Sequence, residues 1–133
     1  MFIDASAVIA SLTGEPEAEI VGAKIDAART AFAVSPVSLL ETVANLARIL
    51  REDHDTAHAR VQEFLRVLDA RTVSITPEIG MTAIAAHARY GKGRGHKARL
   101  NLGDCFAYAC AKQLRVPLLC VGDDFIHTDV KVA

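Results

Sequence analysis

Short apolar runs alternate along this chain with longer segments in which apolar residues recur every three or four positions. The short runs predict β-strands at residues 1–3, 31–35, 73–75 and 118–121. The longer segments predict helices that begin near residues 5, 16, 36, 57, 77 and 102. Strands that alternate with helices in this way are typical of an α/β domain, in which right-handed crossovers connect the strands of a parallel sheet.

Details of the pattern also predict how individual segments pack. Residues 118–121 form an unbroken apolar run, as expected for a central parallel strand that is buried on both faces. Residues 128–130 are expected to add an edge strand, which gives a central sheet of four to five strands. In the last helix, Leu102 is expected to be buried. The helix before it is expected to bury a stripe formed by Met81, Ile84, Ala85 and Ala88.

Composition fits one soluble domain spanning residues 1–133, because 51% of the 133 residues are hydrophobic. The formal net charge of −1 does not indicate a nucleic-acid-binding protein, so such a function needs a local basic region. The three cysteines lack the spacing of a metal site and are expected to be buried free thiols in a reducing cytoplasm. No apolar run approaches the roughly 20 residues of a membrane span, and acidic Asp4 argues against a signal peptide, so neither membrane insertion nor secretion is expected.

Four acidic residues are expected at one edge of the predicted sheet. Asp4 follows the first strand, Glu41 lies in the helix after the second, and Asp123 follows the fourth. Asp104 lies in the first turn of the helix before the fourth strand. Because that helix runs antiparallel to the strand, its first turn also points to the edge where the strands end. Ligands of parallel α/β sheets bind at this edge, so the acids predict a functional site there.

Each acid also has a purely structural explanation. Asp4 can cap the first helix, Glu41 can complete a capping box with Ser38, Asp104 can do so with Asn101, and the fourth acid can belong to a turn. These roles do not explain why four acids gather, since unit charges about 5 Å apart repel by roughly 3 kcal/mol at an effective dielectric of about 20. A bound cation would relieve this repulsion. Ligation by oxygen alone favours Mg²⁺ or Mn²⁺ over zinc.

Residues 91–99 contain no acid and have glycine at positions 91, 93 and 95, which predicts a mobile basic loop just before Asp104. This loop is expected to hold a polyanion through Lys92, Arg94, Lys97 and Arg99, with Arg89 beside them, although it can also be a solvated loop without a ligand. Metal ions at the acids would activate a water and stabilise the leaving oxygen of a phosphodiester. The acids and the loop together predict metal-dependent cleavage of a nucleic acid.

The same residues resemble a known family. The order Asp4-Ala5-Ser6, Glu41, Asp104 and Gly122-Asp123-Asp124-Phe125 resembles the PIN domain, and specifically the VapC toxins of bacterial type II toxin-antitoxin systems. The tract from Tyr90 through Phe106 is similar to one subgroup of these toxins, and the resemblance covers essentially the whole chain. It implies a three-layer α/β/α PIN-like fold with a central parallel sheet.

The resemblance also implies an activity, a cofactor and partners. It implies a ribonuclease that cleaves structured RNA with Mg²⁺ or Mn²⁺, forms a homodimer, and is inhibited by a VapB-like antitoxin in a larger assembly. By position, Asp4, Glu41 and Asp104 match the three central acids and Asp123 matches the fourth. Ser6 matches a hydroxyl that helps to hold the site. Asp124 competes for the fourth role, although it also resembles a structural acid that precedes an aromatic residue.

Other protein classes fit the sequence less well. A receiver-type signalling domain also binds Mg²⁺ on a parallel sheet, but it needs an aspartate at the end of the third strand, where this chain has Ile75-Thr76. A phosphatase of the haloacid dehalogenase type needs a second aspartate where this chain has Ser6. The remaining alternative is a PIN fold with weak or no catalysis that only binds RNA or protein.

Overall fold

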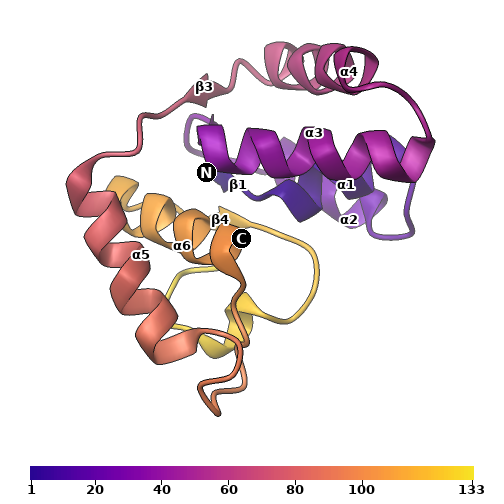
Figure 1. Cartoon of the computed structure of the whole chain (residues 1–133). Coiled ribbons are helices and arrows are strands. Elements are labelled where there is room, and N and C mark those ends of the chain that lie inside the picture. The colour runs from indigo at the N-terminus through magenta and orange to yellow at the C-terminus, as the bar shows by residue number, and fades with distance from the viewer.

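Four short parallel strands form the centre of the computed structural model, which describes residues 1–133 (Figure 1). The strands are β1 (Phe2–Ile3), β2 (Ala33–Val34), β3 (Arg71–Thr72) and β4 (Leu118–Leu119), in the spatial order β3-β2-β1-β4. The helices between and after them are α1 (Ala5–Thr13), α2 (Ala18–Asp26), α3 (Pro36–Leu50), α4 (His54–Val67), α5 (Pro77–Tyr90) and α6 (Leu102–Leu114), followed by a short 3-10 helix at Phe125–His127. β1 and β4 are therefore neighbours in space although almost the whole chain separates them.

Helices cover both faces of this sheet, because successive residues of each strand point to opposite sides. Phe2 and Leu118 belong to a core with α5 and α6, whereas Ile3 and Leu119 belong to a second core with α1, α2, α3 and α4. Figure 1 shows the two groups of helices on either side of the strands. The predicted three-layer α/β/α architecture is confirmed.

The helix starts agree closely with the sequence, because most are fixed by local capping. Asp4, Ser35, Asp53, Thr76 and Asn101 each accept a hydrogen bond from a backbone N–H in the first turn of the helix that follows. Pro36 and Pro77 occupy the first helical positions, where a missing N–H costs nothing. The second helix was expected to begin near Pro16 and instead begins at Ala18, after a turn, and the helix expected near residue 57 instead begins at His54.

Two strand predictions are wrong in position. The third strand lies at Arg71–Thr72 rather than at residues 73–75, and both of its residues are exposed at the end of the sheet. An exposed edge strand needs no apolar residues, so hydrophobicity did not reveal it. Residues 128–130 are bends rather than a strand, and the additional strand-like contact is a parallel bridge between Leu118 and Val132.

The predicted buried stripe of α5 is also wrong. Met81 and Ile84 are 67% and 65% exposed, while Ile79, Ala83 and Ala86 face the core. This helix carries apolar residues on two faces, and the small alanines allow the closer approach to α6. Leu102, expected to be buried, is 72% exposed at the first position of α6.

The remaining general features follow the expectations more closely. Cys105, Cys110 and Cys120 are buried free thiols, as predicted. No helix of the chain combines the length and the apolar character that a bilayer crossing requires.

Candidate active site

Asp4 lies at the end of β1, buried, where it caps α1. Its Oδ2 accepts hydrogen bonds from Ser6 N at 3.0 Å and from Ser6 Oγ at 2.6 Å. Ser6 Oγ in turn accepts a hydrogen bond from Val121 N at 3.0 Å. Ser6 therefore fixes the Asp4 carboxylate and ties it to the segment that follows β4, which agrees with its predicted supporting place beside the site.

Asp104 makes the capping box that the sequence offered as its structural explanation. Asn101 N donates to Asp104 Oδ2 at 2.7 Å, and Asp104 N donates to Asn101 Oδ1 at 2.9 Å, so the capping box at the start of α6 is present. The hydrogen bond from Asn101 N occupies one of the two carboxylate oxygens of Asp104. The same helix start carries the acid to the edge of the sheet at which Asp4 lies.

Glu41 lies in the second turn of α3 and makes no capping box. The cap of α3 is Ser35, whose Oγ accepts a hydrogen bond from Ser38 N at 3.1 Å, so the structural explanation for Glu41 through Ser38 is wrong. The Glu41 side chain instead reaches the first turn of α6. A Cβ atom placed on Gly103 would lie 2.0 Å from Glu41 Oε2, which shows how closely this carboxylate approaches the glycine beside Asp104.

Burial is the main cause of a raised pKa in all three of these carboxylates, and the charges of neighbouring acids add to it. Burial, and then the charges of Asp4 and Asp104, raise the pKa of Glu41 to about 7. Burial, together with the charges of Asp4 and Asp124, raises the pKa of Asp104 to about 6 against the lowering effect of the Asn101 bond. Burial also raises the pKa of Asp4. The three ion pairs of the chain lie elsewhere, so no Lys, Arg or His compensates this acid cluster.

The structure distinguishes the two neighbouring acids that follow β4. The charges that raise the pKa values of Asp4 and Asp104 include Asp124 and do not include Asp123. Both side chains are exposed. The structure therefore brings Asp124 into electrostatic contact with the other acids, whereas the sequence comparison by position had selected Asp123.

The acids do not close around a single point. No three Asp, Glu, His or Cys side chains lie where one metal ion would contact them all. The gathering at one edge expected from the sequence is thus present as an electrostatic cluster of Asp4, Glu41, Asp104 and Asp124. We call these four residues the acid cluster.

The basic loop at residues 91–99 is anchored at its base. Gly91 and Leu100 form a parallel bridge, with Lys92 N donating to Leu100 O at 2.9 Å. His96 packs edge-on against Tyr90 with ring centroids 4.9 Å apart, and Ala98 is fully buried. Outside these contacts the loop exposes the basic side chains predicted from the sequence, namely Lys92, Arg94, Lys97 and Arg99.

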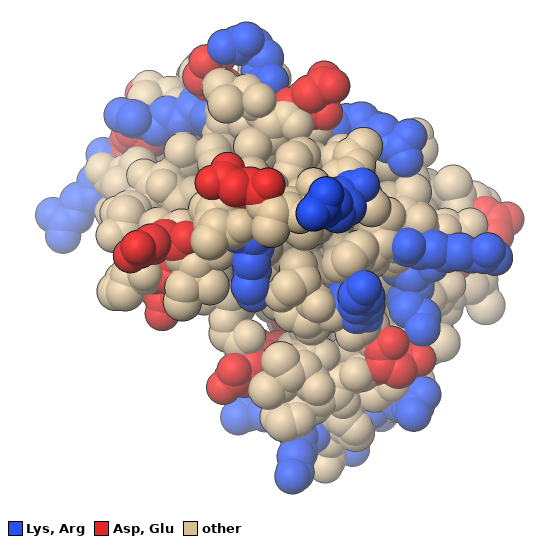
Figure 2. Space-filling model, turned by 180° about the vertical axis from the view of Figure 1, so that it is seen from behind, with Lys and Arg blue, Asp and Glu red and all other residues tan.

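Basic residues are not confined to this loop. Figure 2 shows that Lys and Arg side chains are numerous along the right-hand side of the rear face, with acidic side chains between them. The near-zero net charge thus hides strongly uneven local charge.

Gly103 is the residue of the site that sequence reasoning missed. It lies within the tract that carries the resemblance, yet no role followed for it from spacing alone. The signal was a glycine inside the first turn of a helix, where it costs stability and so suggests a close approach by another group. The approaching group, Glu41, is distant in sequence and could not be identified without the fold.

Comparisons with known proteins identify the family of the chain. Residues 1–131 match the PIN domain family. The VapC ribonuclease R02377 of Rhizobium meliloti is 39% identical, with 97% of this chain and 98% of the relative covered. Ribonuclease VapC36 of Mycobacterium tuberculosis is 42% identical, with 98% of this chain and 91% of the relative covered.

Two solved structures share the fold at low sequence identity. VapC20 of Mycobacterium tuberculosis, described as a toxin that cleaves the sarcin-ricin loop, is similar with a TM-score of 0.78 and 17% identity over 99% of this chain and 97% of that one. A toxin-antitoxin complex from Klebsiella pneumoniae is similar with a TM-score of 0.69 and 19% identity over 99% and 95% of the two chains. The family match over nearly all residues favours the predicted PIN fold over a receiver-type domain. The chain therefore belongs to the PIN domain family, in its VapC group.

Proposed function

We propose that this chain is a metal-dependent endoribonuclease that acts as a VapC toxin and cleaves structured RNA. The observation that carries the proposal is the acid cluster, in which burial and neighbouring acids raise the pKa values of Asp4, Glu41 and Asp104 and no basic residue pairs with them. The ribonuclease names of relatives that align over nearly the full length support the same activity.

The residues fit a Mg²⁺ or Mn²⁺ cofactor. All the available ligands are carboxylate oxygens, and Mg²⁺ binds through few carboxylates while it keeps several waters, so it does not need three side chains in direct contact. Asp4, Glu41 and Asp104 would hold the ion, with Asp124 or Asp123 as the fourth acid. When bound, such an ion lowers the pKa of a water molecule and neutralises charge on the phosphodiester.

The other residues of the site support this chemistry from fixed positions. Ser6 holds the Asp4 carboxylate in one orientation through two hydrogen bonds. The start of α6 holds Asp104 through the capping box. The exposed cations of the basic loop, at Lys92, Arg94, Lys97 and Arg99, would hold the RNA backbone beside the acids without reading its sequence.

The proposed partners are structured RNA, a VapB-like antitoxin that inhibits the enzyme, and a second copy of the chain. A similar structure described as a toxin-antitoxin complex supports the antitoxin. Met81, Ile84, Leu40 and Leu102 are each at least 65% exposed, and large exposed apolar side chains of this kind support burial in a homodimer or a larger toxin-antitoxin assembly.

An RNA cleavage assay tests the proposed activity. Purified protein should cut structured RNA with Mg²⁺ or Mn²⁺, lose activity in EDTA, and lose at least about a hundredfold in rate on Asp4→Asn, because electrostatic stabilisation of charge at such a site is worth that much. Cleavage that survives both EDTA and Asp4→Asn would contradict the proposal. Binding of RNA without cleavage in any metal would instead favour the alternative of a non-catalytic RNA-binding PIN domain.

A further inference from the structure

A pocket lies at the edge of the sheet opposite the acid cluster. It has a volume of about 770 Å³ and is lined by residues that precede strands, including Thr30 before β2 and Val116 and Pro117 before β4. In the acid cluster, by contrast, Asp4 follows β1, Glu41 follows β2 and Asp124 follows β4. Because all four strands are parallel, residues before and after them lie at opposite edges, so the pocket is separate from the proposed active site.

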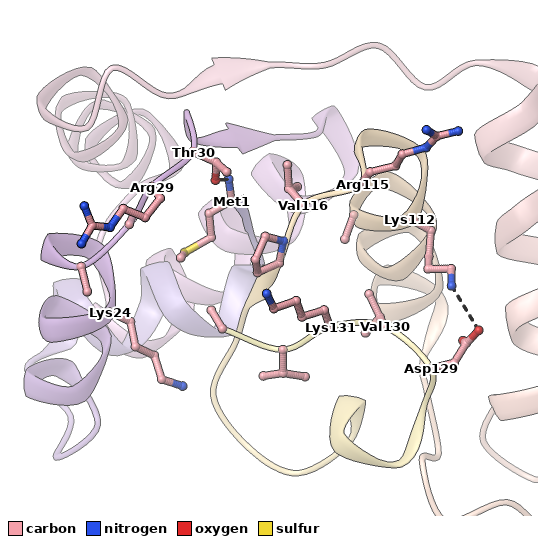
Figure 3. A pocket seen from close by; sticks show the side chains of 16 residues that line it. Met1, Lys24, Arg29, Thr30, Lys112, Arg115, Val116, Asp129, Val130 and Lys131 are labelled. Carbon is pink, nitrogen blue, oxygen red and sulfur yellow. Dashed lines mark hydrogen bonds and ion pairs between the residues drawn. The ribbon is translucent and has the colours of Figure 1, made fainter.

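Basic side chains surround this pocket. Its lining contains Lys24, Arg29, Lys112, Arg115 and Lys131. In Figure 3, Lys131 extends towards the middle of the pocket, Lys24 and Arg29 lie on one side and Lys112 and Arg115 on the other, and the guanidinium groups of Arg29 and Arg115 point outwards at the rim. These residues come from α2, α6 and three loops, so the fold gathers them from separate parts of the chain.

Most of this positive charge has no acidic partner. Asp129 has the one acidic side chain in the lining, and Lys112 Nζ pairs with its Oδ2 at 3.1 Å. Tyr108 and Tyr90 donate hydrogen bonds to the other oxygen of Asp129. No ion pair involves the four remaining basic residues. The pocket therefore keeps a net positive charge that favours an anion.

The rest of the lining is apolar. Half of the sixteen lining residues are hydrophobic, among them Ala28, Ala111 and Val130. Ligand pockets are typically about 300–1,000 Å³ in volume and mostly apolar, with a few polar groups that orient the ligand. A cavity of this size, with cations at its rim and apolar walls, fits a molecule with an anionic group and a flat organic part better than a bare anion.

We propose that this pocket binds a nucleoside phosphate, with the phosphate held by the unpaired cations and the base against the apolar wall. The site is independent of the acid cluster and of any metal held there. It also does not depend on the proposed ribonuclease activity, since none of its residues belongs to that site.

Isothermal titration calorimetry with the full chain in EDTA tests this site, using ATP, AMP, adenosine and pyrophosphate as probes. EDTA removes metal-bridged binding of phosphate at the acids. ATP and AMP should bind, while adenosine and pyrophosphate should each bind at least about tenfold more weakly than ATP, because each lacks one of the two recognised parts. Equal binding of pyrophosphate and ATP would overturn the proposal in favour of a general anion site, and no binding of ATP would overturn it outright.

Paired variants locate the site. Lys24→Gln with Lys131→Gln should weaken ATP binding at least about tenfold through loss of charge-assisted hydrogen bonds. The fold should be retained, because Lys131 contributes to the sheet through its backbone carbonyl, which accepts a hydrogen bond from Leu118 N at 2.8 Å. The matched control, Arg48→Gln with Arg60→Gln, removes the same charge outside the pocket. Equal losses of ATP affinity in the two double variants would overturn the assignment of ATP binding to this pocket.

Discussion

Gly103 lies directly before Asp104 in α6 and determines how closely the Glu41 side chain can approach this acid. Any side chain there would begin with a Cβ atom 2.0 Å from Glu41 Oε2, which is not a permitted contact. The obstructed atom is the end of a flexible side chain, so the carboxylate can move away at little cost to the fold. A substitution should therefore disturb the geometry of the acid cluster more than the stability of the protein.

Gly103→Ala should lower the rate of RNA cleavage at least about tenfold, because displacement of a catalytic group by about 1 Å can cost more than that. The melting temperature should be unchanged or slightly higher, since alanine is favoured over glycine in helices by about 1 kcal/mol. Gly80→Ala in α5 is the matched control, as a Cβ atom there meets nothing within 4 Å. Full activity of Gly103→Ala would contradict the role assigned to this glycine.

The raised pKa of Glu41 predicts a pH dependence of stability in the absence of metal. An acid whose pKa is higher in the folded than in the unfolded state binds more protons when folded, so stability falls as pH rises from the usual value of 4.5 to about 7. Without metal, the melting temperature should be a few degrees higher near pH 5 than near pH 7.5. Glu41→Gln should reduce this difference when both proteins are melted in EDTA, and identical pH profiles would contradict the mechanism.

Helices were easier to predict than strands because their signals are local. Ser35-Pro36, Thr76-Pro77 and Asn101 each satisfy the first backbone N–H groups of a helix within a few residues. The outward face of α5 was mispredicted because the helix has apolar residues on two faces. Only its packing against α6 determines which of the two faces is buried. Arg71–Thr72 pairs as a strand through its backbone alone, which leaves no pattern of hydrophobicity to detect.

The segment that follows the 3-10 helix is fixed to two helices through Asp129. Tyr108 Oη of α6 donates to Asp129 Oδ1 at 2.5 Å, and Tyr90 Oη of α5 donates to the same oxygen at 3.2 Å. These bonds and Lys112 lower the pKa of Asp129 to about 2, with the Tyr108 bond as the largest cause. The stabilisation is therefore present at neutral pH and is lost as pH falls towards 2.

Tyr108→Phe should reduce the free energy of unfolding by about 1 kcal/mol at pH 7, the usual contribution of one hydrogen bond when its partner is partly exposed. Urea denaturation measures this change. Tyr90→Phe is the matched control, because it removes the longer of the two bonds to the same carboxylate oxygen and should cost less. An equal or larger loss for Tyr90→Phe would show that Tyr108 does not dominate this contact.

The protein as a whole separates opposite charges to opposite edges of one sheet. Asp4 after β1, Glu41 after β2 and Asp124 after β4 belong to the acid cluster, and residues before these three strands line the basic pocket. The sequence predicted the acidic edge because acids at strand ends follow a general rule of parallel sheets. It did not predict the basic edge, since Lys24, Arg115 and Lys131 have no common spacing and meet only in the folded chain.

Mg²⁺ should raise the melting temperature of the protein, because a ligand that binds only the folded state at 100 times its Kd stabilises it by about 2.7 kcal/mol. Asp104→Asn should melt higher than the wild type in EDTA, since it removes one repelling charge and keeps an oxygen for the capping bond. Mg²⁺ should also raise the melting temperature of this variant less than it raises that of the wild type.

A neighbouring pair of variants tests the fourth acid in the same melting experiment. Asp124→Asn should reduce the response to Mg²⁺ more than Asp123→Asn, because Asp124 is the acid whose charge reaches Asp4 and Asp104. The reverse order would assign the fourth position to Asp123. No Mg²⁺ response in the wild type would contradict the shared metal site itself.

The bond between Ser6 and Val121 joins two residues that are 115 positions apart, next to the pairing of β1 with β4. During synthesis, the chain therefore carries Asp4 from the start but lacks the strand that supports it until residues 118–121 have left the ribosome. A domain generally folds as a unit, so the support of Asp4 by Ser6 and Val121 forms only when this strand is available. A nascent chain is thus expected to lack the proposed ribonuclease activity until residues 118–121 have emerged.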